Sequence, residues 1–326
     1  MTNLTLKNKS ILLSGEKYRT ENGMFAIKDG ISNRKAQHIK INKPQWLKTK
    51  PLRSSRKYLE IKSTTSRLNL ATICEEGKCP NMNECWSNGT ATIMIMGKIC
   101  TRACRFCSVD TGNPNKILDS NEPRNVAQTI KKMKLDYVVL TSVDRDDLDD
   151  GGASHYAKVV KQIKIENHKV KIEVLTPDFS GNTKSLELLI NSEIDVFAQN
   201  IETVRRLTPI VRDNRSGYDQ TIKVLEYVKK RSSVFTKSSV MLGLGEEKKE
   251  VLRLMDDLRN VGVDVFTLGQ YMQPTENHFP ISRFVSPEEF SYYRKVALSK
   301  GFKEVFSGPM VRSSYRADSI FNKLQS

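Results

Sequence analysis

Residues 91–107 read ATIMIMGKICTRACRFC, a short apolar run followed at once by three cysteines. A bounded apolar run of this length is typical of a buried strand. Five similar runs follow along the chain: DYVVLTS (136–142), VKIEVLTP (170–177), IDVFAQN (194–200), SSVMLGLG (238–245) and VDVFTLGQY (263–271). Near-continuous apolar strands favour a parallel sheet that is covered on both faces.

Stretches with helical spacing separate these strands. Four of them are NEPRNVAQTIKKMK (121–134), HYAKVVKQIKI (155–165), YDQTIKVLEYVKKR (218–231) and EEKKEVLRLMDDLRNVG (246–262). Regular alternation of strand and helix predicts a parallel sheet with right-handed crossovers. Six such units predict an α/β fold, a partial (β/α)6 barrel of the TIM type. SPEE at 286–289 is a capping box that opens a last helix, which ends near residue 300.

The chain divides into four parts around this barrel. Its 326 residues can bury one large core with appendages. Residues 1–70 contain no clear strand and are expected to wrap the barrel as an N-terminal extension, and 71–90 form a cysteine-bearing segment. The barrel is expected over 91–285, and a C-terminal helix with a polar tail over 286–326.

Charge and hydropathy limit the partners. The net charge is +16, which reflects either a lysine-rich solvated surface or an anionic partner. Nucleic acid is the weaker candidate, because the chain has no RNA-recognition signature with interleaved aromatic residues. No run approaches 18 apolar residues, so no membrane span is expected. The N-terminus lacks the features of a targeting leader, so the protein is expected in the cytoplasm.

All six cysteines lie between residues 74 and 107. Secreted disulfide scaffolds are short and spread their cysteines along the chain, whereas this chain is long and groups them. Clustered thiols in a reducing compartment usually bind metal or carry out redox chemistry. Disulfides are therefore not expected.

The second cysteine group, Cys100, Cys104 and Cys107, has the spacing C-x3-C-x2-C. Three thiolates this close can hold three corners of a cubic 4Fe–4S cluster and leave its fourth iron open. Structural zinc requires four protein ligands, and no histidine lies near enough in sequence to complete the set. An iron–sulfur cluster is the favoured interpretation, with zinc or incidental cysteines as the alternatives.

This loop resembles the signature of the radical S-adenosylmethionine (SAM) superfamily, with Phe106 as the aromatic residue before the last cysteine. The resemblance implies that SAM binds the open iron through its amino and carboxylate groups. It also implies that an electron from the cluster cleaves SAM to methionine and a 5′-deoxyadenosyl radical. In such enzymes the cofactor carries the difficult chemistry and the protein positions it.

The first cysteine group, Cys74-x4-Cys79-x5-Cys85, would by itself allow a zinc half-site. Beside a radical SAM loop it indicates a second, auxiliary 4Fe–4S cluster. CEEGKCPNMNEC, followed by the radical loop, resembles the lipoyl synthase family. The resemblance continues in order through KPQWLK (43–48), TSVDRDDLDDGGA (141–153), GLGE (243–246), LGQYMQP (268–274) and SGPMVRSSY (307–315).

The resemblance implies insertion of two sulfur atoms, at carbons 6 and 8 of an octanoyl group attached to a lysine of a lipoyl carrier domain. Two C–H bonds without acidic protons must be broken, so two SAM molecules are consumed, and the auxiliary cluster is the sulfur donor. The resemblance implies that this donor cluster is held by Cys74, Cys79 and Cys85. Ser314 of RSSY is its fourth ligand, although composition alone makes RSSY an ordinary polar tail.

Further residues are implied as SAM contacts at the carboxyl ends of the strands, where active groups of such barrels gather. They are Asp150, Gly151 and Gly152 in the acidic turn 144–152, Asn200 and Glu202 after the fourth strand, and Gly243 and Gly245 after the fifth. A solvated acidic turn and an ordinary glycine turn are the alternatives. AQNIETV (198–204) departs from the family pattern N-H-N-x-E-T-V, so only Asn200 and Glu202 are carried over there.

The implied partners follow from the same resemblance. They are octanoylated carrier domains (acyltransferase subunits of 2-oxoacid dehydrogenases and the glycine cleavage H protein), flavodoxin or ferredoxin as electron donor, and an iron–sulfur carrier protein. Carrier domains of this type are typically acidic, which gives the positive charge a role in steering. A tRNA methylthiotransferase-like enzyme is the alternative within the superfamily, and a zinc-binding nucleic-acid module is the alternative from another class.

Overall fold

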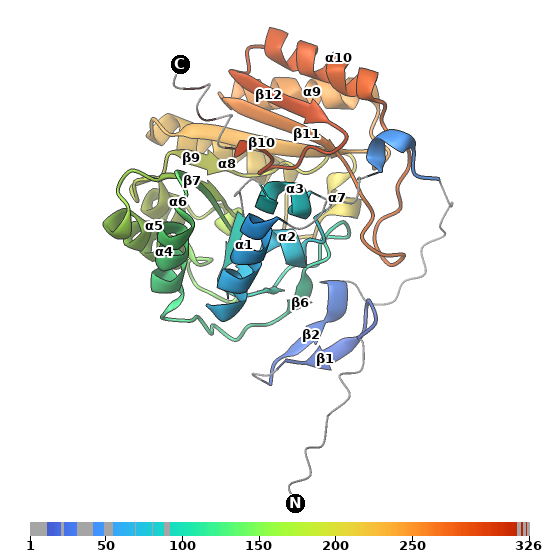
Figure 1. Ribbon diagram of the computed structural model, residues 1–326. Coiled ribbons are helices and arrows are strands. Elements are labelled where there is room, and N and C mark those ends of the chain that lie inside the picture. The colour runs from blue at the N-terminus through green and yellow to red at the C-terminus, as the bar shows by residue number, and fades with distance from the viewer. Residues whose placement is uncertain are drawn as a thin grey trace, which may run out of the picture.

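The computed structural model describes residues 12–20, 23–30, 42–48, 55–68, 70–79, 81–87, 92–317, 321 and 324. Its main sheet has the strand order β12-β11-β10-β9-β8-β7-β4-β3. Neighbouring strands run parallel, except that β3 pairs antiparallel with β4. β3 and β12 stand at the two ends of this order, and the sheet curves as a partial barrel (Figure 1).

The six expected strand–helix units are confirmed. The strands are β4 (Thr92–Ile95), β7 (Tyr137–Ser142), β8 (Lys171–Leu175), β9 (Val196–Ala198), β10 (Phe235–Leu242) and β11 (Val265–Gln270). The helices that follow them are α4 (Glu122–Met133), α5 (Ala153–Glu166), α6 (Thr183–Ile190), α8 (Tyr218–Arg231), α9 (Lys248–Asn260) and α10 (Pro287–Ser299). After α10 the chain adds one more parallel strand, β12 (Glu304–Gly308), and before β4 it adds β3 (Ala71–Thr72).

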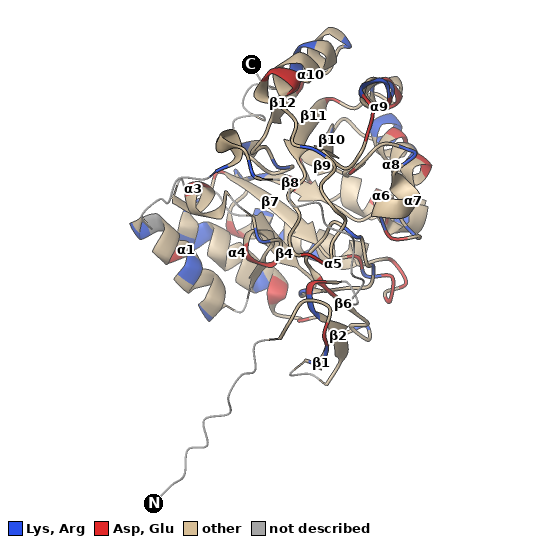
Figure 2. Cartoon of the chain, turned by 90° about the vertical axis from the view of Figure 1, so that its right-hand side faces the viewer, with Lys and Arg blue, Asp and Glu red and all other residues tan. Residues whose placement is uncertain are grey.

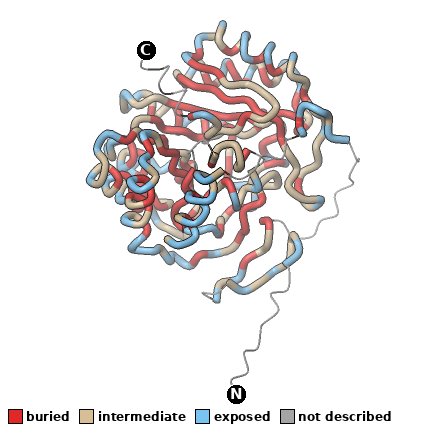
Figure 3. Tube along the Cα trace, in the orientation of Figure 1, coloured by how far each residue is buried: buried red, intermediate tan, exposed pale blue. Residues whose placement is uncertain are grey.

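The core lies between the strands and the covering helices. Every residue of β4 and of β11 is buried, which agrees with strands covered on both faces. Figure 3 shows the buried strands inside a shell of helices whose outer faces are exposed. Local signals set the helix starts: the Ser286 hydroxyl accepts the backbone N–H of Glu289 at 3.2 Å and caps α10. Glu247 forms a capping box with Glu250 at the start of α9.

The N-terminal extension contains strands, contrary to expectation. β1 (Lys17–Arg19) and β2 (Phe25–Ile27) form a hairpin that joins β6 (Asp110–Gly112) and β5 (Ile99–Cys100) in a second, small sheet. Figure 1 shows this sheet at the edge of the main body. Three-residue strands are too short to show a hydrophobic period, so the sequence pattern does not reveal them. β1 pairs with β2, and β2 pairs with β6, which lies far away in sequence.

Other short elements complete the described chain. They are η1 (Lys28–Gly30), η2 (Gln45–Leu47), α1 (Arg56–Arg67), α2 (Ile73–Glu76), α3 (Met82–Ser87), η3 (Phe179–Gly181) and α7 (Thr208–Val211). Figure 2 shows Lys and Arg spread over several elements and interleaved with acidic residues. Among the helices described, none has both the length and the apolarity needed to cross a bilayer.

Candidate cluster-binding sites

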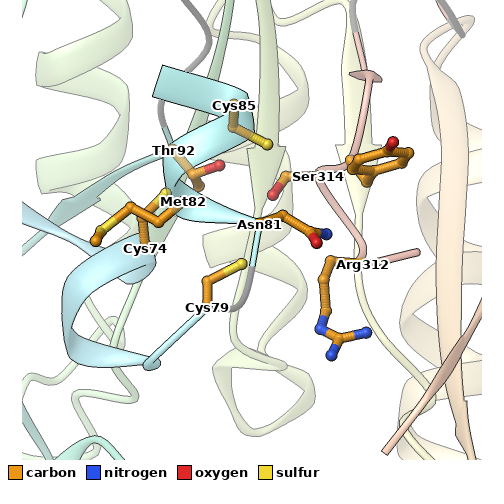
Figure 4. A pocket seen from close by; sticks show the side chains of 9 residues that line it. Cys74, Cys79, Asn81, Met82, Cys85, Thr92, Arg312 and Ser314 are labelled. Carbon is orange, nitrogen blue, oxygen red and sulfur yellow. The ribbon is translucent and has the colours of Figure 1, made fainter. Parts of the chain in front are cut away.

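The first cysteine group folds into a tight loop that gathers its three thiols. Thr72 caps α2, which carries Cys74, by accepting the backbone N–H of Glu75 at 3.3 Å. The backbone N–H of Cys79 then donates to the carbonyl of Cys74 at 3.0 Å, and α3 presents Cys85 from the other side. The three cysteines line one pocket (Figure 4).

The C-terminal RSSY segment lines the same pocket. Arg312 and Ser314 stand opposite the cysteines (Figure 4), and Tyr315 also lines the pocket, so the structure brings Ser314 to the first cysteine group. Hydrogen bonds hold the segment there: the Asn81 side-chain amide donates to the carbonyl of Met310 at 2.6 Å. On the other side of the segment, the Tyr315 hydroxyl donates to Glu84 Oε1 at 3.1 Å.

The donor set of this pocket suits an iron–sulfur cluster. Thiolate is the metal-binding form of cysteine, yet burial, followed by the neighbouring thiols, raises the pKa of Cys85 to about 12. Burial likewise raises the pKa of Cys74. Metal binding must therefore displace protons from these thiols. The cationic side chain of Arg312, which lines the same pocket, favours the negative charge that thiolates bring.

The second cysteine group receives backbone hydrogen bonds at sulfur. Cys100 Sγ accepts the N–H groups of Arg102 at 3.4 Å and of Asp144 at 3.3 Å, and Cys104 Sγ accepts the N–H of Asp213 at 3.3 Å. Burial is the main cause that raises the pKa of Cys104 to about 12 and of Cys107 to about 11. Donors aimed at sulfur stabilise thiolates once iron displaces the protons. The loop follows β4 and faces the carboxyl ends of the strands, as predicted.

Carboxylates of the acidic turn 144–152 hold the loop that carries Cys100, Cys104 and Cys107. Arg102, between Cys100 and Cys104, is 3% exposed, and its guanidinium lies 2.7 Å from Asp146, 2.8 Å from Asp178 and 3.3 Å from Asp144. Three carboxylates from two strand ends thus fix the loop's orientation. The alternative of a merely solvated turn therefore does not hold for Asp144 and Asp146, which pair with a buried arginine.

The last three residues of that turn, Asp150, Gly151 and Gly152, lead directly into α5. The Asp150 carboxylate accepts the backbone N–H groups of Gly152 at 2.9 Å and Ser154 at 2.8 Å. A Cβ on Gly152 would lie 2.1 Å from Met96 Sδ, so close packing requires glycine there. Gly151 lines a cavity of about 390 Å³ that Arg102 also borders. Of the three candidates, only Gly151 lines this cavity, where Phe179 packs against it.

Asn200 and Glu202 lie beside the second cysteine group. The carboxylate of Glu202 interacts with Cys107 and Arg212, and burial raises its pKa. Asn200 Oδ1 is buried and has no hydrogen-bond partner among the described residues, which marks a place for a polar ligand. The positive charge of Arg212 lies close enough to Cys104 to oppose the rise in the pKa of that thiol. Arg212 could not be identified from the sequence, because no motif surrounds it.

Gly243 and Gly245 shape the turn after β10. Both have left-handed backbones, with φ values of 99° and 106°, which glycine adopts without strain. Glu246 closes the turn by accepting the N–H groups of Gly243 at 2.7 Å and Leu244 at 2.9 Å. These contacts give the glycines a structural role, which was the alternative considered from sequence.

The two cysteine groups do not converge as the ligands of one metal ion would. Across the part of the chain that the structure describes, no three His, Cys, Asp or Glu side chains are placed to hold a single ion. None of the six cysteines forms a disulfide. The thiols form two separate groups: Cys74, Cys79 and Cys85 line one pocket with Ser314, and Cys107 of the second group lies near Glu202.

Comparisons with known proteins identify the family of this chain. Residues 94–258 match the Radical SAM superfamily. A protein named lipoyl synthase from Francisella tularensis subsp. holarctica (strain LVS) is 58% identical over 311 residues, which cover 95% of this chain and 95% of the relative. A second protein of that name, from Legionella pneumophila (strain Corby), is 57% identical over 318 residues, which cover 96% of this chain and 95% of the relative. The FeFe-hydrogenase maturase HydG from Carboxydothermus hydrogenoformans superposes with a TM-score of 0.51 at 13% identity, covering 82% of this chain and 78% of its own, which supports the fold alone.

Proposed function

The chain belongs to the lipoyl synthase family of radical SAM enzymes, and from this premise we propose how its residues divide the sulfur-insertion reaction. The family uses SAM and 4Fe–4S clusters. Two separate cysteine groups suit two clusters with different tasks. The observation that carries the proposal is the meeting of Ser314 with Cys74, Cys79 and Cys85 in one pocket.

Cys100, Cys104 and Cys107 hold the radical-forming cluster in this proposal. When bound, that cluster supplies the electron that cleaves SAM to methionine and a 5′-deoxyadenosyl radical. The backbone N–H groups aimed at Cys100 and Cys104 stabilise their thiolates. We assign Asn200 and Glu202 to polar groups of SAM, because Glu202 lies near Cys107 and the buried Asn200 Oδ1 has no hydrogen-bond partner among the described residues. Gly151 lines the cavity that Arg102 also borders. Asp150, Gly152, Gly243 and Gly245 support these contacts by shaping the turns.

Cys74, Cys79, Cys85 and Ser314 hold the auxiliary cluster, the proposed sulfur donor. A serine oxygen is a harder ligand than thiolate and binds iron less well. Ser314 is therefore suited to leave first when the cluster gives up sulfur. Arg312 lines the pocket and keeps a positive charge beside the thiolates as the cluster changes.

The substrate is an octanoyl group carried on a lysine of a lipoyl carrier domain. Carbons 6 and 8 carry no acidic proton, so side chains acting as acids or bases cannot activate them, and hydrogen abstraction by a carbon radical is required. We propose flavodoxin or ferredoxin as the electron donor and an iron–sulfur carrier protein as the source of new clusters. The net charge of +16 favours association with acidic carrier domains. Free cysteines suit a reducing compartment, so we place the enzyme in the cytoplasm.

Two cysteine variants test the division of labour. Cys104→Ala removes a ligand of the radical-forming cluster and should abolish both 5′-deoxyadenosine and lipoyl product in a single anaerobic turnover on an octanoylated carrier. Cys79→Ala should retain 5′-deoxyadenosine formation and lose the lipoyl product, because the radical forms without a sulfur donor. Lipoyl product at the wild-type yield from Cys79→Ala would contradict the donor assignment.

A further inference from the structure

The two cysteine groups must keep a fixed spacing for sulfur insertion to follow radical formation. The radical forms at one group, and the carbon it activates must then reach sulfur held by the other. Misplacement of reacting groups by about 1 Å can slow a reaction by about 100-fold. Among the described residues, the Ser108 hydroxyl, next to Cys107, donates to the carbonyl of Glu76 at 2.9 Å, and Lys98 Nζ lies 4.0 Å from Glu76 Oε1. Both polar contacts reach only Glu76 of the first loop, so other parts of the fold also contribute to the spacing.

The N-terminal hairpin contacts both cysteine loops through Asp29. Lys78, which precedes Cys79, donates from Nζ to Asp29 Oδ1 at 2.8 Å. The backbone N–H of Asp29 donates to Asp110 Oδ1 at 2.8 Å, and Asp110 opens the strand that follows Cys107. Asp29 is 4% exposed, so its carboxylate is held inside the junction and not in solvent.

Further contacts hold the segment around Asp29 against the strand that begins at Asp110. The Tyr18 hydroxyl donates to Asp110 Oδ2 at 2.6 Å, and Lys28 Nζ lies 3.2 Å from Asp110 Oδ1. A Cβ on Gly30 would lie 2.6 Å from the carbonyl oxygen of Val109 and 3.3 Å from that of Cys107, so the hairpin packs directly on the radical loop. Asp29 has a left-handed backbone (φ 57°), a conformation that Asp and Asn tolerate better than most residues.

We propose that Asp29 is a positioning residue that sets the spacing of the two cysteine loops and thereby the lipoyl product formed per radical. The inference rests on the proposed division of the two clusters. Among the described residues, the hydrogen bonds of Asp29 join Lys78 and Asp110 and no cysteine, and those at Cys100 and Cys104 come from other elements. Loss of its carboxylate should therefore spare each cluster and SAM cleavage, while the two loops lose their shared anchor.

The test compares lipoyl product per 5′-deoxyadenosine in a single anaerobic turnover, together with the distance between the two reduced clusters by pulsed EPR. Asp29→Ala should keep the iron content, lower the product ratio by about tenfold or more, and broaden the distance distribution. Lys78→Met should act in the same direction, and the double variant should be no worse than Asp29→Ala, because both changes break one link. Asp29→Asn keeps an acceptor oxygen and the backbone N–H, so it should restore part of the ratio.

Asp264→Ala is the matched control. Asp264 is also a buried carboxylate, 2% exposed, and lies 2.6 Å from Lys229 and 3.0 Å from Lys303, far from both cysteine groups in the fold. It should lower stability and leave the ratio and the cluster distance unchanged. The inference is overturned if Asp29→Ala keeps the wild-type ratio of lipoyl product to 5′-deoxyadenosine and a narrow distribution of cluster distances. It is also overturned if lipoyl product and 5′-deoxyadenosine fall in proportion. If the wild-type enzyme itself forms 5′-deoxyadenosine without lipoyl product, the proposed function fails instead.

Should Asp29→Ala lose its clusters on purification, Asp29→Asn and Lys78→Met decide the question by the same two measurements. Both retain the contact between the backbone N–H of residue 29 and Asp110. A normal ratio in both variants overturns the inference.

Discussion

Replacing Ser314 by alanine should separate sulfur transfer from radical formation. The hydroxyl lines the pocket of Cys74, Cys79 and Cys85, whereas the adjacent Ser313 is not among the described residues that line it (Figure 4). Ser314→Ala should therefore remove one ligand of the auxiliary cluster and leave the radical loop intact. We expect lipoyl product to fall at least about tenfold, since a missing ligand changes the cluster itself, with 5′-deoxyadenosine largely retained.

The expected effect on stability is too small to explain such a loss. Both serines are half-buried, and polar changes of this kind shift the free energy of unfolding by about 0.5 kcal/mol or less. With an unfolding entropy of about 2.1 cal/mol/K per residue and 326 residues, that shift lowers Tm by about 1 °C or less. Any large loss of product must then come from the site.

The assay is a single anaerobic turnover on an octanoylated carrier, with both products quantified and Tm measured on the same preparations. Ser313→Ala is the control and should form product close to the wild-type amount. Mössbauer spectra should show an altered auxiliary cluster in Ser314→Ala alone. Equal, near-normal product from the two variants would refute the ligand role and return RSSY to an ordinary tail.

Two predictions concern the barrel interior. Lys237 is 1% exposed and lies 2.8 Å from Glu173. Lys237→Met should destabilise the protein by about 3–5 kcal/mol, because a buried carboxylate loses its positive partner. Calorimetry should show recovery of stability when Glu173→Leu is added, and an unchanged stability in the single variant would contradict this. Phe321 is 3% exposed and packs 5.7 Å from the Tyr137 ring and 6.1 Å from that of Phe235, so Phe321→Ala should cost about 3–5 kcal/mol. An unchanged Tm in Phe321→Ala would show that these ring contacts contribute little.

The sequence by itself determined the alternating architecture and the grouping of the cysteines. Strand and helix differ in the period of their apolar residues, and that period is written in neighbouring residues, so all six units were predictable. The spacing of Cys100, Cys104 and Cys107 is likewise local, since a short loop limits where three thiols can lie. The resemblance to the lipoyl synthase family rested on such local motifs and is confirmed by the curated relatives.

Only the tertiary structure decided which distant residues meet. Ser314 reaches the first cysteine group because β12 returns the chain to the sheet edge and Asn81 holds the carbonyl of Met310. The burial of Arg102 among three carboxylates and the role of Asp150 as a helix cap also depend on long-range packing. The same holds for the three-residue strands of the N-terminal hairpin, which are too short to be stable alone. β2 pairs with β6, and that pairing is specified by the folded surface and not by the period of the residues in β2.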